Sequence, residues 1–220
     1  MALGRERPIE NVLTVVFFVV ALVPAIVLHE VSHGYVADRF GDHTARMAGR
    51  LSLNPIRHVD PFGTVILPGL LLLPHLFGRG QNPVFGYAKP VPINPANLSH
   101  PDRQTMWIAL AGPATNLGLA IVGALGFRFV GAGAGEISRF LFIFVAVNVL
   151  LAVFNILPIP PLDGSKVLAR YLPPRAREIY RSWEAYGALF MLVIFFLFPG
   201  AIFGIVDPIV TGLFGLLVGS

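Results

Sequence analysis

The 220-residue sequence has no cysteine and few charged residues. The lack of cysteine excludes disulfides, thiolate zinc sites and cysteine nucleophiles, so any bound metal must be held by histidine and carboxylate side chains. Charged residues make up 13% of the chain and apolar residues 55%, whereas soluble globular domains are roughly 25% charged. This composition indicates an integral membrane protein.

Long polar segments are also missing. None exceeds about 30 residues, whereas soluble domains begin near ~50 residues, so we predict one integral membrane domain over residues 1–220. The net charge of +4 could suggest nucleic-acid binding, but the basic residues lie in loops beside apolar stretches, as the positive-inside rule predicts. We therefore expect the lipid bilayer as a partner, and no nucleic acid.

Charge-free stretches cover residues 11–28, 104–127, 140–162 and 185–206. Each is near or above the ~18 residues typical of a membrane-spanning helix. The sequence predicts an all-α polytopic membrane bundle, with a core of three helices within about residues 8–167 and C-terminal helices within about 183–218. The predicted core helices cover residues 8–37, 105–130 and 139–156. The C-terminal region is expected to break at Pro199–Gly200 and Asp207–Pro208, giving two short spans or one span plus a hairpin.

Two segments between the first and second predicted spans are irregular. Residues 62–77 are apolar but contain Pro68-Gly69 and Pro74, which favours a re-entrant hairpin over a spanning helix. Residues 82–95 alternate apolar residues with prolines and glycines. This pattern predicts a small membrane-associated β element whose edge could dock a peptide.

The end of the first predicted span reads His-Glu-x-x-His, from His29 to His33. Four-residue spacing places the two imidazoles on one helix face, one turn apart, so both can bind one zinc ion. Glu30 lies about 100° away around the helix, where its carboxylate can accept a proton from a water on the metal without joining the ligands. The alternative is that the histidines only hydrogen-bond between helices, but burying three ionisable groups in an apolar span without a metal is costly.

A catalytic zinc ion normally has three protein ligands, and Asp163 is the best candidate for the third. It follows the third predicted span and the proline-rich run that contains Pro158, Pro160 and Pro161, which prevents a continuous helix. Non-helical backbone at membrane depth must line protein or water. The alternative role for Asp163 is capping a helix that begins near Ser165.

Together these two motifs resemble the site-2 protease family of intramembrane zinc metalloproteases, in which a His-Glu-x-x-His helix pairs with a distant Asn-Pro-Asp-Gly type segment. The resemblance extends from about residue 27 to 167 and includes Gly112-Pro113-x-x-Asn116. It implies one Zn²⁺ per chain held by His29, His33 and Asp163.

The resemblance also implies roles for nearby residues. Glu30 would be the catalytic acid/base, and Asn155 would orient the substrate or stabilise the oxyanion. Asn116 and Asn148 are weaker candidates, whose alternative role is hydrogen bonding between helices. The other four histidines show no pairwise ligand spacing, and we expect no metal role for them: His43, His58, His75 and His100.

A shared zinc ion requires the end of the first span and the end of the third span to lie on the same side of the membrane. A re-entrant segment at residues 62–77 satisfies this requirement. Twelve of the sixteen lysines and arginines lie in the loops at that side, so the positive-inside rule predicts a cytoplasmic active site. The family resemblance implies a prokaryotic cell membrane.

The predicted activity is hydrolysis of a peptide bond in or near a transmembrane segment of a membrane-protein or peptide substrate, as in regulated intramembrane proteolysis. The alternatives are a divalent-metal transporter, which would not need Glu30, and a catalytically silent membrane scaffold. The spacings Gly200-x3-Gly204 and Gly215-x3-Gly219 would also permit a homo-oligomer through close helix packing.

Overall fold

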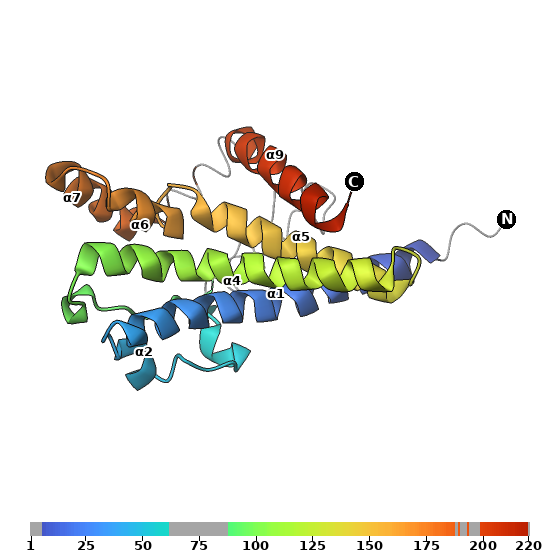
Figure 1. Ribbon diagram of the computed structural model, residues 1–220, viewed down its shortest axis with the longest axis horizontal. Coiled ribbons are helices and arrows are strands. Elements are labelled where there is room, and N and C mark those ends of the chain that lie inside the picture. Colours follow the sequence, from blue (N-terminus) through green and yellow to red (C-terminus); the bar gives the residue numbers. More distant parts are fainter. Residues whose placement is uncertain (1–5, 62–87, 188, 190–192, 194–198, 220) are drawn as a thin grey trace.

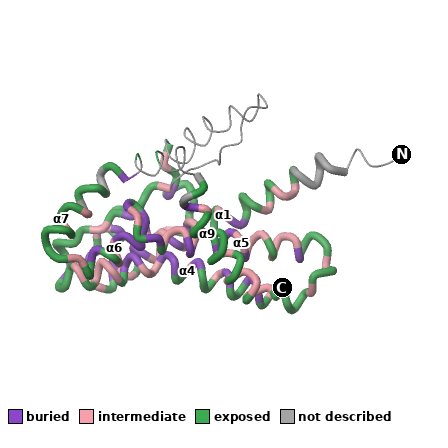
Figure 2. Tube along the Cα trace, turned by 90° about the horizontal axis from the view of Figure 1, so that it is seen from above, coloured by how far each residue is buried: buried purple, intermediate pink, exposed green. Residues whose placement is uncertain are grey.

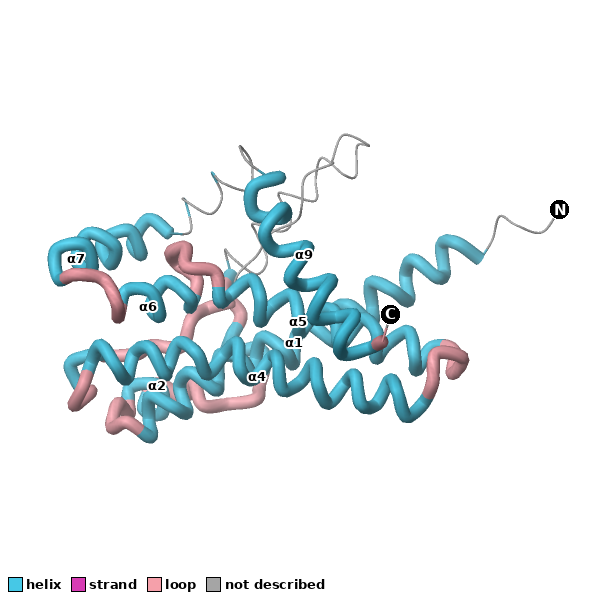
Figure 3. Tube along the Cα trace, turned by 45° about the horizontal axis from the view of Figure 1, so that its top comes forward, coloured by secondary structure: helices cyan, strands magenta, loops and turns pink. Residues whose placement is uncertain are grey.

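The structure is a computed structural model that describes residues 6–61, 88–187, 189, 193 and 199–219. In chain order its elements are α1 (Glu6–Arg39), α2 (Thr44–Met47), the 3₁₀ turns η1 (Pro55–His58) and η3 (Pro95–Asn97), α4 (Pro101–Val130), α5 (Glu136–Ile156), α6 (Asp163–Ala169), α7 (Pro174–Ser182), the 3₁₀ turn η4 (Trp183–Tyr186) and α9 (Pro199–Val218). The described residues form helices and loops without a strand (Figure 3). The predicted all-α class is confirmed.

Three long helices, α1, α4 and α5, pack against one another along the bundle (Figure 1). Residues Val12–Arg39, Pro101–Val130 and Glu136–Ile156 are each long and apolar enough to cross a membrane. The 21 residues of α5 extend about 31 Å at ~1.5 Å per residue, which matches the ~30 Å hydrocarbon core of a bilayer. The three predicted core helices are therefore confirmed.

The three long helices alternate in direction (Figure 1), so the C-terminal ends of α1 and α5 lie at the same end of the bundle. A tight turn between α4 and α5 makes this possible. Gly131 and Gly135 have φ values of +84° and +63° in this turn, a region that favours glycine. The arrangement agrees with the parity that a shared metal site requires, while the segment predicted to be re-entrant, residues 62–77, lies outside the described residues.

Small residues let the helices approach closely. Ala21 and Ala25 of α1 are fully buried in one cluster with Val147 of α5. A second cluster joins α4, α5 and α9 through buried apolar residues, among them Ala120, Val149 and Val206. Buried residues gather where α1, α4, α5 and α6 meet (Figure 2), and this region contains the site described below.

The β element predicted at residues 82–95 is not supported. Residues 82–87 lie outside the described residues, and residues 88–94 form no strand. The reason lies in their backbone donors. Pro90 and Pro92 have no N–H. Three other backbone amides donate to distant groups: that of Lys89 to the His58 carbonyl, that of Val91 to the Glu30 carboxylate and that of Asn94 to the Asp42 carboxylate.

One predicted helix break is wrong. Helix α9 covers Pro199–Val218 and continues through Pro208, where a break was predicted. Proline inside a helix costs one backbone hydrogen bond and some steric strain, which membrane helices tolerate better than soluble ones. Its stretch Ile202–Val218 is an apolar helix shorter than the three long spans.

Candidate metal centre

His29 and His33 lie one turn apart on α1 and are 7% and 6% exposed. Their rings meet edge to face, with centroids 4.6 Å apart. The four-residue spacing on an unbroken helix thus places both imidazoles on one buried face, as predicted.

Asp163 reaches these histidines because α6 begins directly against the end of α5. Residues 157–162 are non-helical, as the prolines predict, and α6 begins at Asp163. A Cβ on Gly164 would lie 2.0 Å from the Ile156 carbonyl oxygen and 2.4 Å from that of Leu157. Only glycine permits this close approach, so the Asp-Gly pair is explained by backbone packing as well as by the carboxylate.

The three side chains converge. Asp163 Oδ2 lies 3.1 Å from the Nε2 atom of each histidine, and one ligand atom from each residue lies within 4.8 Å of the others. The oxygens of Asp163 face His29, His33 and Lys166, so its carboxylate does not cap α6.

The Nδ1 atoms of the two histidines, on the ring side away from Asp163, each contact an oxygen atom. His29 Nδ1 lies 2.6 Å from Asn116 Oδ1, and His33 Nδ1 lies 2.6 Å from the Ile108 carbonyl oxygen. Because oxygens of this kind only accept hydrogen bonds, each Nδ1 carries a proton, and the Nε2 atom of each imidazole faces Asp163.

The donor set therefore fits a zinc ion. In its neutral form each imidazole has a lone pair on Nε2, so both nitrogens and the carboxylate oxygen can bind one cation. Ligands about 2.0–2.2 Å from a tetrahedral zinc ion are ~3.3 Å apart, close to the 3.1 Å that separates Asp163 Oδ2 from each Nε2.

Space for an ion is kept open by Gly112 of α4. A Cβ at this position would lie 2.5 Å from Nε2 of both His29 and His33. Any other residue would therefore occupy the volume toward which the ligand atoms point. The Gly-x-x-x-Asn pattern of the middle helix combines this open position with Asn116, one turn later.

Glu30 lies beside the cluster with one carboxylate oxygen anchored. Its Oε2 accepts a hydrogen bond of 3.0 Å from the Val91 amide. The close approach of residue 91 depends on Gly34, where a Cβ would lie 2.9 Å from a methyl carbon of Val91 and 2.7 Å from one of Leu51. The segment that contains Val91 thus packs on α1 next to the histidines.

Comparisons with known proteins identify the family. The family model described as peptidase family M50 matches residues 131–198. Over 187 residues, 81% of this chain and 80% of the other, the chain is 36% identical to "Putative zinc metalloprotease YwhC" of Bacillus subtilis (strain 168). The chain belongs to peptidase family M50. The resemblance to site-2 proteases is thereby confirmed.

A second M50 relative supports the assignment. The chain is 30% identical over 197 residues to "Putative zinc metalloprotease Rip2" of Mycolicibacterium smegmatis, covering 88% of this chain and 72% of that protein. No solved structure matches the chain. Its M50 membership therefore rests on sequence, and the site geometry on the structure described above.

In this M50 peptidase the three candidate asparagines have different surroundings. Asn116 and Asn148 are fully buried, and Asn116 contacts a clustered histidine directly. Asn155 is half-buried, and its side-chain amide donates to the Leu151 carbonyl one turn earlier in α5. Asn116 and Asn148 thus form the helix-to-helix hydrogen bonds that the sequence left open as their alternative role, and for Asn116 one of these contacts reaches His29.

Three of the other histidines have local partners. His43 Nδ1 lies 2.8 Å from Asp38 Oδ1, His58 Nε2 lies 2.8 Å from the Ser52 carbonyl, and His100 lies beside Ser99. These three histidines are not among the clustered residues His29, His33 and Asp163, and His75 lies outside the described residues.

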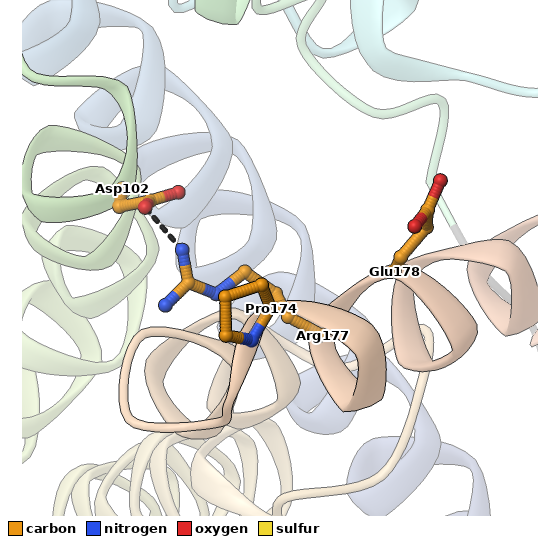
Figure 4. Close-up of a pocket in the computed structure, with 4 residues that line it drawn as sticks. All are labelled: Asp102, Pro174, Arg177 and Glu178. Carbon is orange, nitrogen blue, oxygen red and sulfur yellow. Dashed lines mark hydrogen bonds and ion pairs between the residues drawn. The ribbon is translucent and has the colours of Figure 1, made fainter.

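A surface cavity of about 390 Å³ lies away from the M50 cluster, between α4 and α7. It is lined by Asp102, Pro174, Arg177 and Glu178, and Arg177 points toward Asp102 (Figure 4). Arg177 also donates to the carbonyls of Ala169 and Leu172. Its charge is thus used to tie α6, α7 and α4 together, and none of the metal-cluster residues lines this cavity.

Proposed function

We propose that this M50 peptidase is an intramembrane zinc metalloendopeptidase that acts as a single integral domain. Its substrates would be membrane proteins, cleaved in or near a transmembrane segment during regulated proteolysis. The observation that carries the proposal is the convergence of His29, His33 and Asp163 at one end of three helices long enough to span a membrane. The names of the relatives also support zinc and proteolysis.

In this proposal His29, His33 and Asp163 hold one Zn²⁺ per chain and leave a fourth position for water or substrate. When bound, zinc lowers the pKa of a water molecule and polarises the carbonyl that the water attacks. The buried surroundings of the three side chains limit access of bulk water, which strengthens the electrostatic effect of the site.

Glu30 is proposed as the acid/base. With Oε2 held by the Val91 amide, the carboxylate is kept in one orientation, from which it can accept a proton from the attacking water and later donate it to the leaving amine. Asn155 has a two-proton amide, of which one N–H is used by the Leu151 carbonyl. The second can donate to the substrate carbonyl and stabilise the charge that develops on its oxygen.

We further propose that the catalytic end faces the cytoplasm. Twelve of the sixteen lysines and arginines lie between residues 39 and 103 or between 166 and 181. The described parts of both segments lie at the end of the bundle where α1 ends and α4 begins (Figure 1). Positive charge is retained on the cytoplasmic side during insertion.

The deciding experiment measures zinc content and cleavage of a membrane-spanning reporter by wild type, Glu30→Gln and Glu178→Gln. Glu178 is an exposed carboxylate on α7 and serves as the matched control. We expect about one zinc per chain in all three proteins. Cleavage should fall by at least about 100-fold in Glu30→Gln alone, because general acid–base catalysis is lost.

Other outcomes would contradict the proposal. Wild-type protein without stoichiometric zinc would overturn the metal assignment, and equal cleavage by Glu30→Gln would overturn the role of Glu30. Zinc transport into vesicles without cleavage of any reporter would instead support a transporter.

A further inference from the structure

Asn116 is completely buried in α4 and contacts two other helices. Its Oδ1 lies 2.6 Å from His29 Nδ1 on α1. Its Nδ2 donates to the Ala25 carbonyl of α1 at 3.2 Å and to Asn148 Oδ1 of α5 at 3.0 Å. A single side chain thus connects a candidate metal ligand to both neighbouring spans.

The direction of this hydrogen-bond chain is set by two backbone carbonyls. The Ala25 carbonyl can only accept, so the amide nitrogen of Asn116 faces it and the oxygen faces His29. In the same way the Phe144 carbonyl accepts from Asn148 Nδ2 at 2.9 Å, which leaves Asn148 Oδ1 to accept from Asn116. Both amide orientations follow from groups that cannot reverse their role.

We propose that Asn116, oriented by Asn148, is a positioning residue that fixes the tautomer of His29 and thereby sets the metal affinity of the site. Because Asn116 presents only its oxygen, His29 carries its proton on Nδ1 and keeps the Nε2 lone pair toward the metal position. This inference rests on the proposed zinc site. It assigns to a buried pair on α4 and α5 a function beyond helix packing.

The two ligand histidines differ in a way that makes the proposal testable. His33 is held by the Ile108 backbone carbonyl, which no side-chain substitution removes. His29 is held by the side chain of Asn116. Removing the hydrogen-bond partner of a metal-bound histidine typically changes metal affinity by about 10–100-fold. A substitution of Asn116 should therefore change zinc affinity through His29, while the hydrogen bond of His33 stays in place.

The experiment compares Asn116→Leu, Asn148→Leu and Asn155→Leu in the full chain in detergent. Asn155 is the matched control for metal affinity, since it is an asparagine on α5 that also bonds to a backbone carbonyl one turn earlier. Zinc affinity is measured by competition with a chelator, and the ligand field by absorption of the cobalt-substituted protein. In metal-free protein, ¹⁵N NMR of the histidine rings reports the tautomer.

We expect Asn116→Leu to weaken zinc binding about 10–100-fold, to shift the cobalt bands and to populate the Nε2–H tautomer of His29. Asn148→Leu should also weaken zinc binding, but by a smaller factor, because Asn116 keeps its hydrogen bond to the Ala25 carbonyl. Asn155→Leu should bind zinc like wild type. Asn116→Asp keeps an acceptor for His29 and should recover part of the affinity lost in Asn116→Leu.

Wild-type zinc affinity and tautomer in Asn116→Leu would overturn the inference, as would equal losses in Asn148→Leu and Asn155→Leu. If Asn116→Leu does not fold, the Asn148 and Asn155 pair decides the question. Failure of wild type to bind zinc would refute the proposed function, whereas the tautomer in metal-free protein would still test the role of Asn116.

Discussion

Two buried carboxylates of this M50 peptidase, Asp163 and Asp42, are surrounded in opposite ways. Both are under 7% exposed. Asp42 accepts from the Asn94 amide at 2.7 Å, the Asn97 side chain at 2.8 Å and the Thr44 amide at 3.2 Å. Asp163 instead faces the Nε2 atoms of His29 and His33, each at 3.1 Å.

This difference teaches how a structural carboxylate differs from a metal ligand. A buried carboxylate that meets N–H donors from its own chain is satisfied, and it holds the loop before α4 onto the end of α1. A carboxylate that meets two imidazole nitrogens, each able to bind a metal, is a candidate ligand. Burial alone does not distinguish a structural carboxylate from a candidate metal ligand. Proximity to a histidine does not either, since Asp38 also contacts His43.

The largest effect should come from filling the metal position. Gly112→Ala places a methyl group 2.5 Å from both Nε2 atoms, so zinc binding should weaken by more than about 100-fold, beyond the effect of an outer partner. Gly118→Ala, on the same helix, meets nothing within 4 Å and is the control. Chelator competition measures both variants. Equal zinc affinity in the two would break the comparison, because the acceptor cluster would then not be the metal site.

A smaller effect is expected at the satisfied carboxylate. Asp42→Asn loses charge-assisted hydrogen bonds, so the free energy of unfolding should fall by about 1–3 kcal/mol at pH 7, while zinc affinity stays near wild type. Thermal unfolding in detergent measures the first and chelator competition the second. A loss of zinc affinity without a loss of stability would contradict the distinction between the two carboxylates.

The same variant makes a pH prediction. Burial by itself would raise the pKa of the Asp42 carboxyl, but hydrogen bonds from Thr44, Asn97 and the Asn94 amide lower it below its ordinary value. A lowered folded pKa stabilises the fold above the unfolded pKa near ~3.9, and this stability is lost as the pH falls through the folded pKa. The difference in unfolding midpoint between wild type and Asp42→Asn should therefore narrow below about pH 4.

The smallest effect should come from Arg177, whose side chain ties the C-terminal end of α6 to α4 and α7. Arg177→Met keeps the apolar stem but loses the bonds to the Ala169 and Leu172 carbonyls and to Asp102. We expect a loss of about 1 kcal/mol in unfolding free energy, with zinc affinity changed by less than about threefold. Arg175→Met, at an exposed position of the same helix, should match wild type. A large loss of zinc in Arg177→Met would show that the position of α6 controls Asp163.

Much of the site could be predicted because its signals are local. The spacing of His29 and His33 on a helix determines their common face, and the prolines before Asp163 end α5 where the carboxylate is needed. The alternating direction of three apolar spans then brings both motifs to one end of the bundle. These steps need only helical periodicity, chain breakers and span parity.

Other features could not be predicted because they depend on partners distant in the chain. Asn116 lies 87 residues from His29. A polar side chain in an apolar helix indicates a buried hydrogen bond, but the sequence does not say with which residue. The predicted strand failed because Pro90 and Pro92 lack donors and Glu30 took the Val91 amide. Gly112 was part of the family motif, but its role as open space near the Nε2 atoms required the packing of α4 on α1.

The 134 residues that separate Asp163 from His29 also set an order for biosynthesis. While the chain is being inserted, a precursor that has reached only α4 already carries both imidazoles and Glu30, yet it lacks the carboxylate. Asp163, the third proposed ligand, arrives only after α5 has entered the bilayer and Gly164 has docked against its end. Metal loading on the proposed ligands, and with it any capacity to cut neighbouring membrane proteins, is thus postponed until the core of the enzyme has been assembled.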